Sequence, residues 1–419
     1  MKVGIIGTGY VGLITGACFA RLGHEVTCVD VVPEKVRQIN EKKPPIYEEG
    51  LEELLKSVKL KATLDVSEVA DCDAVFIAVP TPMKESGEMD TRFILSAVES
   101  LAPHIPKKWK VIVIKSTVVP GTTESLIPVL PGKPGKDYGL AMNPEFLREG
   151  KAIEDFTHPD RIVIGAFDRK SGDTVEKLYE KIDAKKIRTD IRTAEMIKYA
   201  ANSFLATKIS FINEIANICT RLGIDVETVA EAIGLDRRIS PHFLSAGPGF
   251  GGSCFPKDVH AIISKAESVG YTPELLLSVL DVNDRQPLQV LDWLGRELPS
   301  VQKKKIALLG LAFKPGTDDI RESRSIILAD KLLEEGADVV AFDPQAKYGK
   351  VKQSDLRGAL KDAYAVIIMT DWPEIRDLDL KDAAKLVKNG LILDARRAIS
   401  PEAAKKAGFR YYAIGYPLP

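Results

Sequence analysis

The sequence lacks any apolar stretch long enough to span a bilayer, and it contains no long run of lysine or arginine. Its 58 Lys and Arg residues are balanced by 59 Asp and Glu residues, so the formal net charge at pH 7 is -1. This balance argues against a nucleic acid or a membrane surface as the main partner. The chain begins directly with a strand pattern, without the charged and apolar segments of a secretory signal, and we therefore expect a cytoplasmic protein.

Cysteine is also scarce, with five residues in the chain. The number is odd and no pair has the C-x-x-C spacing, which argues against a disulfide framework and a zinc cluster. Cys18, Cys28, Cys72 and Cys219 fall in predicted strands or helices, where free cysteines are usually small buried hydrophobes. The sequence therefore predicts no metal site. It singles out Cys254, which lies outside these predicted strands and helices.

The length of 419 residues exceeds what one hydrophobic core supports, so two or three domains are expected. Residues 2–30 and 304–343 share one pattern: a basic residue, a short apolar run ending in Gly, a helix, and a Val-rich strand ending in Asp. This is the strand–helix–strand unit of a doubly wound α/β sheet, used twice. Further buried parallel strands are predicted over residues 73–79, 110–115, 365–369 and 390–394.

The segment between the two lobes, residues 190–290, carries no convincing strand. Within it, residues 194–221 have apolar residues at helical spacing and no Pro or Gly, and Gly223 ends the pattern. We expect two Rossmann-like domains joined by a helical middle domain, with boundaries 1–190, 191–295 and 296–419. A long helix in this place commonly supplies a subunit interface, so a homodimer or higher homo-oligomer is expected.

The loop Gly7-Thr8-Gly9-Tyr10-Val11-Gly12 follows a short apolar strand and precedes a helix. In such a loop Gly7 permits the tight turn, Gly9 lets the backbone approach a pyrophosphate, and Gly12 allows close packing of helix on sheet. The helix N-terminus then presents unpaired N–H groups to the phosphates. Asp30, about 20 residues later, suits the ribose 2′-hydroxyl and repels a 2′-phosphate. The sequence therefore predicts NAD rather than NADP.

Residues 247–258, with the sequence GPGFGGSCFPKD, form the least ordinary stretch. Four glycines in six residues predict a loop in which the backbone approaches a ligand closely. Cys254 lies near Lys257 and Asp258, and a nearby cation or a helix start favours the nucleophilic thiolate. The alternative is a small buried hydrophobe.

Eight motifs in order resemble the UDP-glucose/GDP-mannose dehydrogenase family, above all its members that act on UDP-glucose. They cover nearly the whole chain: GTGYVGL, PIYEEGLEELL, VPTP, KSTVVPGT, NPEFLREG, KYAANSFLATKISFINEIA, GFGGSCFPKD and GLAFKPGTDDIRES. The resemblance implies a four-electron oxidation of UDP-glucose to UDP-glucuronate that consumes two NAD+ and one water. It also implies that Cys254 captures the intermediate aldehyde, and that oxidation of the adduct gives a thioester, which water hydrolyses.

Further catalytic roles follow from the same resemblance. Lys198 and Asn202, four residues apart on the long helix, would stabilise the oxyanion at C6. Asp258 and Thr117 would position water and assist proton transfer. Glu145 is the expected acid or base of thioester hydrolysis, and the division of roles among Glu145, Asp258 and Glu149 stays open.

Binding residues carry over in the same way. The cofactor side comprises the glycine loop with Tyr10, Val11 and Asp30, and in addition Lys35, Thr81, Thr117, Glu149, Lys257 and Arg321. The substrate side comprises Glu145, Phe146, Leu147, Arg148, Glu149, Lys198, Asn202, Arg238, Phe243, Leu244, Ser245, Ala246, Gly247, Gly251, Phe313, Lys314 and Arg396. Arg238 matches an arginine that the family donates from a neighbouring subunit, and Arg397 competes with Arg396 for its role.

Two departures from the family pattern are Arg238-Ile239-Ser240, where RIG is common, and Glu48-Glu49-Gly50, where Pro often follows the Glu. They leave the subunit contact and one N-terminal loop open. The rival readings are a dehydrogenase of GDP-mannose or UDP-N-acetylmannosamine, and a catalytically silent NAD-binding regulator. A silent relative would be free to lose part of the set Cys254, Lys198, Asn202, Asp258 and Glu145.

Overall fold

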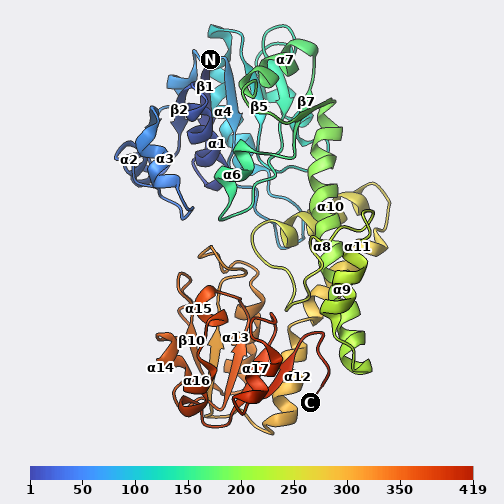
Figure 1. Ribbon diagram of the computed structural model, residues 1–419. Coiled ribbons are helices and arrows are strands. Elements are labelled where there is room, and N and C mark those ends of the chain that lie inside the picture. Colours follow the sequence, from blue (N-terminus) through green and yellow to red (C-terminus); the bar gives the residue numbers. More distant parts are fainter. Residues whose placement is uncertain (419) are drawn as a thin grey trace. The chain divides into compact units, whose positions relative to one another are not determined.

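The computed structural model describes residues 1–418, apart from the side chains of Pro106 and Lys107. The chain divides into two compact units, Met1–Ala201 and Asn202–Pro419. Each unit contains a sheet with helices packed on it (Figure 1).

The first unit is built on an eight-stranded sheet in the order β3-β2-β1-β4-β5-β6-β7-β8. Neighbouring strands are parallel except β6 and β7, which are antiparallel. The order of the first six strands is that of a doubly wound sheet, as the sequence predicted. The strands are β1 (Lys2–Ile6), β2 (Glu25–Val29), β3 (Leu60–Thr63), β4 (Ala74–Ile77), β5 (Val111–Ile114), β6 (Gly139–Met142), β7 (Arg161–Ala166) and β8 (Lys185–Thr189).

Successive strand residues point to opposite faces of the sheet, and the helices of this unit pack on those faces. Val3 and Ile5 of β1 and Phe76 of β4 belong to one core with Phe19 of the first helix. The helices are α1 (Tyr10–Arg21), α2 (Pro33–Asn40), α3 (Leu51–Ser57), α4 (Arg92–Leu101), α5 (Thr122–Ser125), α6 (Ala152–Thr157) and α7 (Arg169–Leu178). Short 3-10 turns are η1 (Val66–Val69), η2 (Ala102–Lys107) and η3 (Ile127–Val129).

The second unit contains a six-stranded, all-parallel sheet in the order β11-β10-β9-β12-β13-β14. This is the same winding as the first six strands of the other sheet, so the second predicted strand–helix–strand unit is confirmed. Its strands are β9 (Lys305–Leu309), β10 (Asp338–Phe342), β11 (Lys352–Gln353), β12 (Ala365–Ile368), β13 (Leu391–Asp394) and β14 (Arg410–Ala413). The helices between them are α13 (Arg324–Glu334), α14 (Leu356–Leu360), α15 (Pro373–Arg376), α16 (Leu380–Leu386) and α17 (Pro401–Lys406).

The described chain forms no strand between β8 and β9, which confirms the helical middle. Its longest element is α8 (Ile191–Leu222), a helix of 32 residues that begins earlier than the sequence pattern indicated. Asp190 explains the difference because its carboxylate accepts hydrogen bonds from the backbone N–H and the hydroxyl of Thr193, at 2.9 and 2.6 Å. Gly223, with φ of +70°, ends the helix as predicted. The other middle helices are α9 (Val226–Gly234), α10 (Phe255–Ser268), α11 (Glu274–Arg285) and α12 (Leu288–Glu297).

Four of the five cysteines are buried, as predicted, and Cys254 is partly exposed. Burial raises the pKa of Cys18 and Cys28 to about 12 and that of Cys72 to about 11. Cys72 lies in a turn before β4 rather than in a strand or helix, which corrects its predicted placement. Over residues 1–418, no helix has the length and apolar character needed to cross a membrane.

Candidate active site and cofactor loop

The glycine loop has the geometry that a bound pyrophosphate requires. Gly7 has φ of +95°, and a Cβ there would meet the backbone oxygen of Ala78 at 2.6 Å. A Cβ on Gly12 would lie 1.9 Å from the carbonyl oxygen of Gly7, so α1 can approach the turn only with glycine there. No atom lies within 4 Å of a Cβ built on Gly9, which leaves open space at the N-terminus of α1. The loop therefore fits a dinucleotide.

Asp30 follows β2 directly and is 8% exposed. One carboxylate oxygen, Oδ2, accepts hydrogen bonds from the backbone N–H and hydroxyl of Thr8, at 2.7 and 2.5 Å, and Oδ1 accepts one from the N–H of Val32 at 3.0 Å. Burial opposes ionisation, but these hydrogen bonds and the charge of Lys35 outweigh it and lower the pKa of Asp30. The carboxylate is thus fixed and ionised beside the loop, as recognition of a ribose hydroxyl requires.

The second sheet does not repeat this arrangement, although Gly310 has φ of +94° and Asp343 follows β10. Like Asp30, Asp343 accepts hydrogen bonds from its own loop, here from the backbone N–H groups of Leu311 and Ala312 to Oδ2 at 2.7 and 3.0 Å. The indole N–H of Trp372 donates to the same oxygen at 3.1 Å. The helix that follows, α13, begins only at Arg324. The dinucleotide geometry therefore belongs to the first unit.

Glu48, which sequence reasoning did not single out, joins three motifs behind the cofactor loop. Its carboxylate accepts hydrogen bonds from the hydroxyl of Tyr10 and from the backbone N–H groups of Gly150 and Ala152, the last two at 2.7 and 2.6 Å. Tyr10 is the first residue of α1, and Gly150 follows Glu149. The signal was present in the sequence as an acidic residue between PIY and a helix, but its partners are about 40 and 100 residues away.

Glu145 and Lys198 form a buried ion pair in the first unit. Their atoms Oε1 and Nζ are 2.9 Å apart, and both side chains are at most 6% exposed. Burial alone would raise the pKa of Glu145, but the charge and hydrogen bond of Lys198 prevail and lower it. The backbone N–H of Leu147 donates to the other carboxylate oxygen at 2.5 Å. Two predicted catalytic residues, 53 positions apart in the sequence, are thus held together with Glu145 ionised.

The aromatic ring of Phe146 lies beside this pair. The guanidinium of Arg161 stacks over it at 3.8 Å and Lys198 Nζ lies 5.4 Å from its centroid. Arg148, by contrast, is exposed and pairs with Asp155 at 2.6 Å. Thr81 and Thr117 follow the carboxyl ends of β4 and β5, the edge at which ligands of doubly wound sheets bind.

Cys254 occupies the position just before α10 in the second unit, so its sulfur lies at the start of a helix, as predicted. Asp258, one turn later and 1% exposed, accepts hydrogen bonds from the amide of Asn202 at 2.6 Å and from the ammonium of Lys257 at 2.5 Å. Asp258, Asn202 and Lys257 therefore form one connected polar group at the first turn of α10, which follows Cys254.

The glycines before Cys254 approach the protein's own atoms, which is a reason for glycine that the sequence did not indicate. A Cβ on Gly251 would meet the carbonyl oxygen of Glu322 at 2.4 Å, and one on Gly252 would meet the ring of Phe313 at 2.8 Å. Close packing of the loop on residues 313–322 thus requires these glycines, whether or not a ligand also approaches them.

Three buried side chains that the sequence did not reveal hold this loop. Asn283 of α11 accepts from the backbone N–H of Phe250 at 2.7 Å and donates to its carbonyl at 3.1 Å. Gln286 donates to the carbonyl of Gly247 at 3.0 Å, and Arg324 donates to that of Phe250 at 2.9 Å. An amide on a helix gives no sequence signal of such a long-range contact.

A cavity of about 400 Å³ in the second unit brings several predicted substrate residues together. Its walls are Val226, Glu227, Ala230, Glu231, Pro241, Leu244, Ser245, Ala246, Asp371, Arg396 and Arg397. Arg396 donates to the carbonyls of Met369 and Phe313, at 3.1 and 2.9 Å. Arg397 is committed to Asp225, with contacts at 2.9 and 3.1 Å. The sequence left open which of the two arginines contacts the substrate, and we therefore favour Arg396.

The remaining predicted residues lie at the surface or in the same loops. Lys314 Nζ lies 5.5 Å from the ring of Phe313, and a Cβ on Gly247 would lie 3.0 Å from Arg396. Phe243 has φ of +64° and is 37% exposed.

The side chain of Arg238 is 89% exposed and pairs with Asp236 at 2.6 Å. Arg321 pairs with Asp319 at 2.6 Å, and its carbonyl accepts from Gly252 at 2.9 Å.

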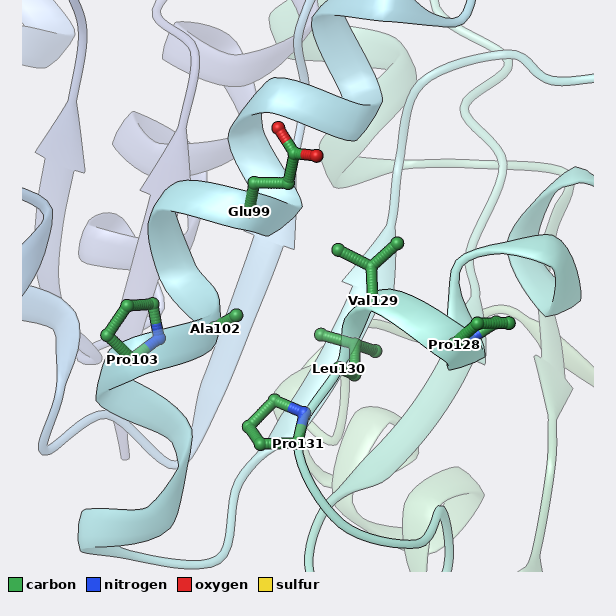
Figure 2. Close-up of a pocket in the computed structure, with 7 residues that line it drawn as sticks. All are labelled: Glu99, Ala102, Pro103, Pro128, Val129, Leu130 and Pro131. Atoms are coloured by element: carbon green, nitrogen blue, oxygen red, sulfur yellow. The ribbon is translucent and has the colours of Figure 1, made fainter.

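A second depression, of about 430 Å³, lies on the first unit away from these residues (Figure 2). Its walls are Glu99, Ala102, Pro103, Pro128, Val129, Leu130 and Pro131, which are mostly apolar and include none of the predicted site residues. Among the described residues, no group of three or more His, Cys, Asp and Glu side chains could hold a metal ion.

The doubly wound sheet, the glycine loop and the ionised Asp30 together define an NAD-dependent dehydrogenase fold. Sequence profiles of the UDP-glucose/GDP-mannose dehydrogenase family match its NAD-binding domain to residues 1–183, its central domain to residues 192–285 and its UDP-binding domain to residues 307–401. The chain belongs to this family, and NAD is its cofactor.

Named relatives agree with this assignment. The chain is 43% identical to the UDP-glucose 6-dehydrogenase TuaD of Bacillus subtilis over 99% of its own length and 93% of that protein. A UDP-glucose dehydrogenase structure from the archaeon Pyrobaculum islandicum has a TM-score of 0.92 and 41% identity, and 99% of this chain and 98% of that one are covered. A UDP-D-ManNAc dehydrogenase structure from Pyrococcus horikoshii also has a TM-score of 0.92, but the identity is 28%, with 99% of each chain covered.

Proposed function

We propose that this protein oxidises UDP-glucose at C6 to UDP-glucuronate, with consumption of two NAD+ and one water. The observation that carries the proposal is the placement of Cys254, the partly exposed thiol, at the start of α10, one helical turn before Asp258. The match of residues 307–401 to a UDP-binding domain and the full-length similarity to UDP-glucose 6-dehydrogenases support the substrate.

The first oxidation converts the C6 alcohol to an aldehyde, and NAD+ supplies the hydride acceptor when it is bound at the Gly7 loop. Lys198 and Asn202 lie one helical turn apart on α8, so both present donors on one face. They stabilise the oxyanion that develops when the alcohol loses its proton. Asp258, which accepts from Asn202, takes part in moving this proton through a water that Thr117 helps to hold.

The second oxidation requires that C6 of the aldehyde first gain a fourth substituent and become tetrahedral. The thiolate of Cys254 adds to the carbonyl, a C–S bond forms, and the oxygen takes a proton to give a thiohemiacetal. Loss of a second hydride, for which the second NAD+ would be the acceptor, together with loss of the hydroxyl proton leaves a thioester on Cys254. Water then attacks the thioester carbonyl with Glu145 as base, the C–S bond breaks, and the thiol is regenerated.

Substrate and cofactor contacts complete the proposal. Arg396, Phe313, Lys314 and the loop from Phe243 to Gly247 bind the nucleotide sugar, and Gly251, Phe146, Leu147 and Arg148 complete its surroundings. Val11, Lys35, Thr81, Glu149, Lys257 and Arg321 lie on the NAD side. The sugar must stay attached to Cys254 while NADH leaves and a second NAD+ binds, so cofactor exchange must occur with substrate held.

The rival substrates are GDP-mannose and UDP-N-acetylmannosamine. The lower identity to the UDP-D-ManNAc dehydrogenase, 28% against 41% for the UDP-glucose dehydrogenase structure, favours UDP-glucose. A silent NAD-binding regulator is disfavoured because the set Cys254, Lys198, Asn202, Asp258 and Glu145 is complete.

The reaction predicts two NADH for each UDP-glucose consumed. With limiting UDP-glucose and excess NAD+, absorbance at 340 nm should give a stoichiometry of about two, because the thioester route includes two hydride transfers. GDP-mannose and UDP-N-acetylmannosamine at the same concentration are the controls. A value of about one would indicate a simple alcohol dehydrogenase, and no NADH from UDP-glucose would reject the proposal.

We also propose that α8 mediates self-association. Phe204, Phe211 and Ile218 recur every seven residues, and Leu222 follows one turn later. They are 66%, 49%, 49% and 67% exposed, so they form an apolar stripe on one face of α8. Arg238 lies in an exposed segment with Leu235 and Ile239, which suits donation of its guanidinium to a neighbouring subunit.

Phe211→Glu is expected to weaken the oligomer at least about tenfold in dissociation constant, because each subunit would place a charge in an apolar contact. Light scattering after size exclusion measures the mass over a concentration series. Glu267→Gln, at an exposed position of α10 outside the stripe, is the control. A wild-type protein that is monomeric at all concentrations, or a variant of unchanged mass, would contradict the interface.

A further inference from the structure

Lys115 is a buried lysine to which the mechanism above gives no role. It follows β5 directly, in the KSTVVPGT motif, and is 4% exposed. Its ammonium donates to the side-chain oxygen of Asn143 at 3.0 Å and lies within reach of the carbonyl of Pro144 at 3.5 Å and the hydroxyl of Tyr179 at 3.4 Å. Burial of a lysine is costly without such partners, so the site is built to hold it.

These contacts lead directly to Glu145. Two donors from separate elements, Lys115 Nζ and the hydroxyl of Tyr179, converge on Asn143 Oδ1, the second at 2.6 Å. The amide nitrogen of Asn143 donates to the carbonyl of Val163 in β7 at 2.8 Å. Asn143 and Pro144 therefore have fixed positions, and Glu145 is the next residue in the chain.

The charges around Lys115 are few and can be named. Lys198 of α8 and Glu145 face it, and Tyr179 has the thiol of Cys18 of α1 as its own titratable neighbour. Burial lowers the pKa of Lys115 to about 7, while Glu145 opposes that shift. Burial raises the pKa of Tyr179, which stays a hydrogen-bond donor. Lys115 also contributes, after Lys198 and the N–H of Leu147, to the lowered pKa of Glu145. In acidic solution, Lys115, Lys198 and Glu145 thus form a buried cluster of two ammonium cations and one carboxylate.

We propose that Lys115 is a positioning residue whose charge keeps Glu145 in its carboxylate form while its hydrogen bonds order the Asn143–Pro144 segment. The proposal rests on the role of Glu145 as base in the proposed function. A purely structural lysine would order the segment without affecting the protonation of Glu145, and this difference can be measured.

The test compares Lys115→Met with Tyr179→Phe. Both variants remove one donor from Asn143 Oδ1, but only the first removes a charge. Without that charge the pKa of Glu145 rises, so less carboxylate is present at low pH and the acid limb of the kcat profile moves to higher pH. The ratio of kcat at pH 8 to kcat at pH 5 should increase at least about threefold over the wild type in Lys115→Met. It should stay at the wild-type value in Tyr179→Phe.

Two further variants guard against a folding defect, which circular dichroism and the thermal midpoint detect. Lys115→Gln is neutral but keeps a donor, and it should show the same raised ratio. Lys115→Arg keeps the charge and should restore the wild-type ratio. Unchanged ratios in both neutral variants, or an equal change in Tyr179→Phe, would overturn the proposal. The proposal would also be overturned if both neutral variants fail to fold while Lys115→Arg folds, because the charge would then be needed for folding.

Failure of this proposal is distinguishable from failure of the proposed function. If the wild-type protein forms two NADH per UDP-glucose but the ratios do not differ, the function stands and Lys115 has no part in tuning Glu145. If the wild-type protein forms no NADH from UDP-glucose, the proposed function itself is wrong and the tuning of its base is rejected with it.

Discussion

Cys254→Ser should reduce formation of UDP-glucuronate by at least about a thousandfold while NAD+ binding stays within about twofold of the wild type. A serine hydroxyl is far less ionised than a thiol near neutral pH, so capture of the aldehyde becomes slow. Cys254 lies at the start of α10 in the second unit, whereas the cofactor loop lies in the first, so the substitution leaves the loop intact. Chromatography of the nucleotide sugars and calorimetric titration with NAD+ measure the two effects.

Cys72→Ser provides the matched control because Cys72 lies in a turn and burial raises its pKa to about 11. Its thiol cannot supply a thiolate near neutral pH, so activity should be retained. Undiminished UDP-glucuronate production by Cys254→Ser would refute the thioester route. Loss of NAD+ binding in the same variant would mean that the residue acts through folding instead.

Gly9→Val should weaken NAD+ binding at least about a hundredfold without lowering the thermal midpoint. Gly9 has φ of -68° and ψ of -168°, a conformation open to any residue, and its Cβ would meet no protein atom within 4 Å. The added side chain therefore fits the free protein but fills the space that the pyrophosphate needs. Calorimetric titration with NAD+ and a thermal melt give the two readings.

Gly12→Ala is the contrasting variant at the same loop. Its Cβ would lie 1.9 Å from the carbonyl oxygen of Gly7, so helix and turn must separate, and both stability and NAD+ binding should fall. Gly349→Ala, at an open position of the second unit, should change neither. Wild-type NAD+ affinity in Gly9→Val would show that the loop does not hold the cofactor.

Sequence reasoning predicted both sheets because each strand–helix–strand unit carries its own local signals: an apolar run, a glycine turn, a helix and a terminal aspartate. The long helix was predicted for the same reason, and its first turn was missed because Asp190 acts through a cap that apolar spacing does not register. The predicted three-domain boundaries stay a prediction.

Residues that act on distant parts of the chain were not predicted. Glu48 binds Gly150 and Ala152, Asn283 binds Phe250, and Lys115 reaches Tyr179. In each of these pairs the partners are between 33 and 104 positions apart, and periodicity carries no information about such pairs. The packing reason for Gly251 and Gly252 was missed in the same way, because their close neighbours lie in residues 313–322.

The sequence by itself determined the kind of sheet, the cofactor loop and the cysteine that stands apart from the others, since these depend on residue type and short spacing. Only the tertiary structure decided which charges meet. It paired Glu145 with Lys198, joined Asp258 to Asn202 and Lys257, and kept the second aspartate, Asp343, occupied by its own loop and Trp372. Protonation and binding depend on distance and burial, and folding brings these groups to hydrogen-bonding distance, from distant positions in the chain except for the neighbours Lys257 and Asp258.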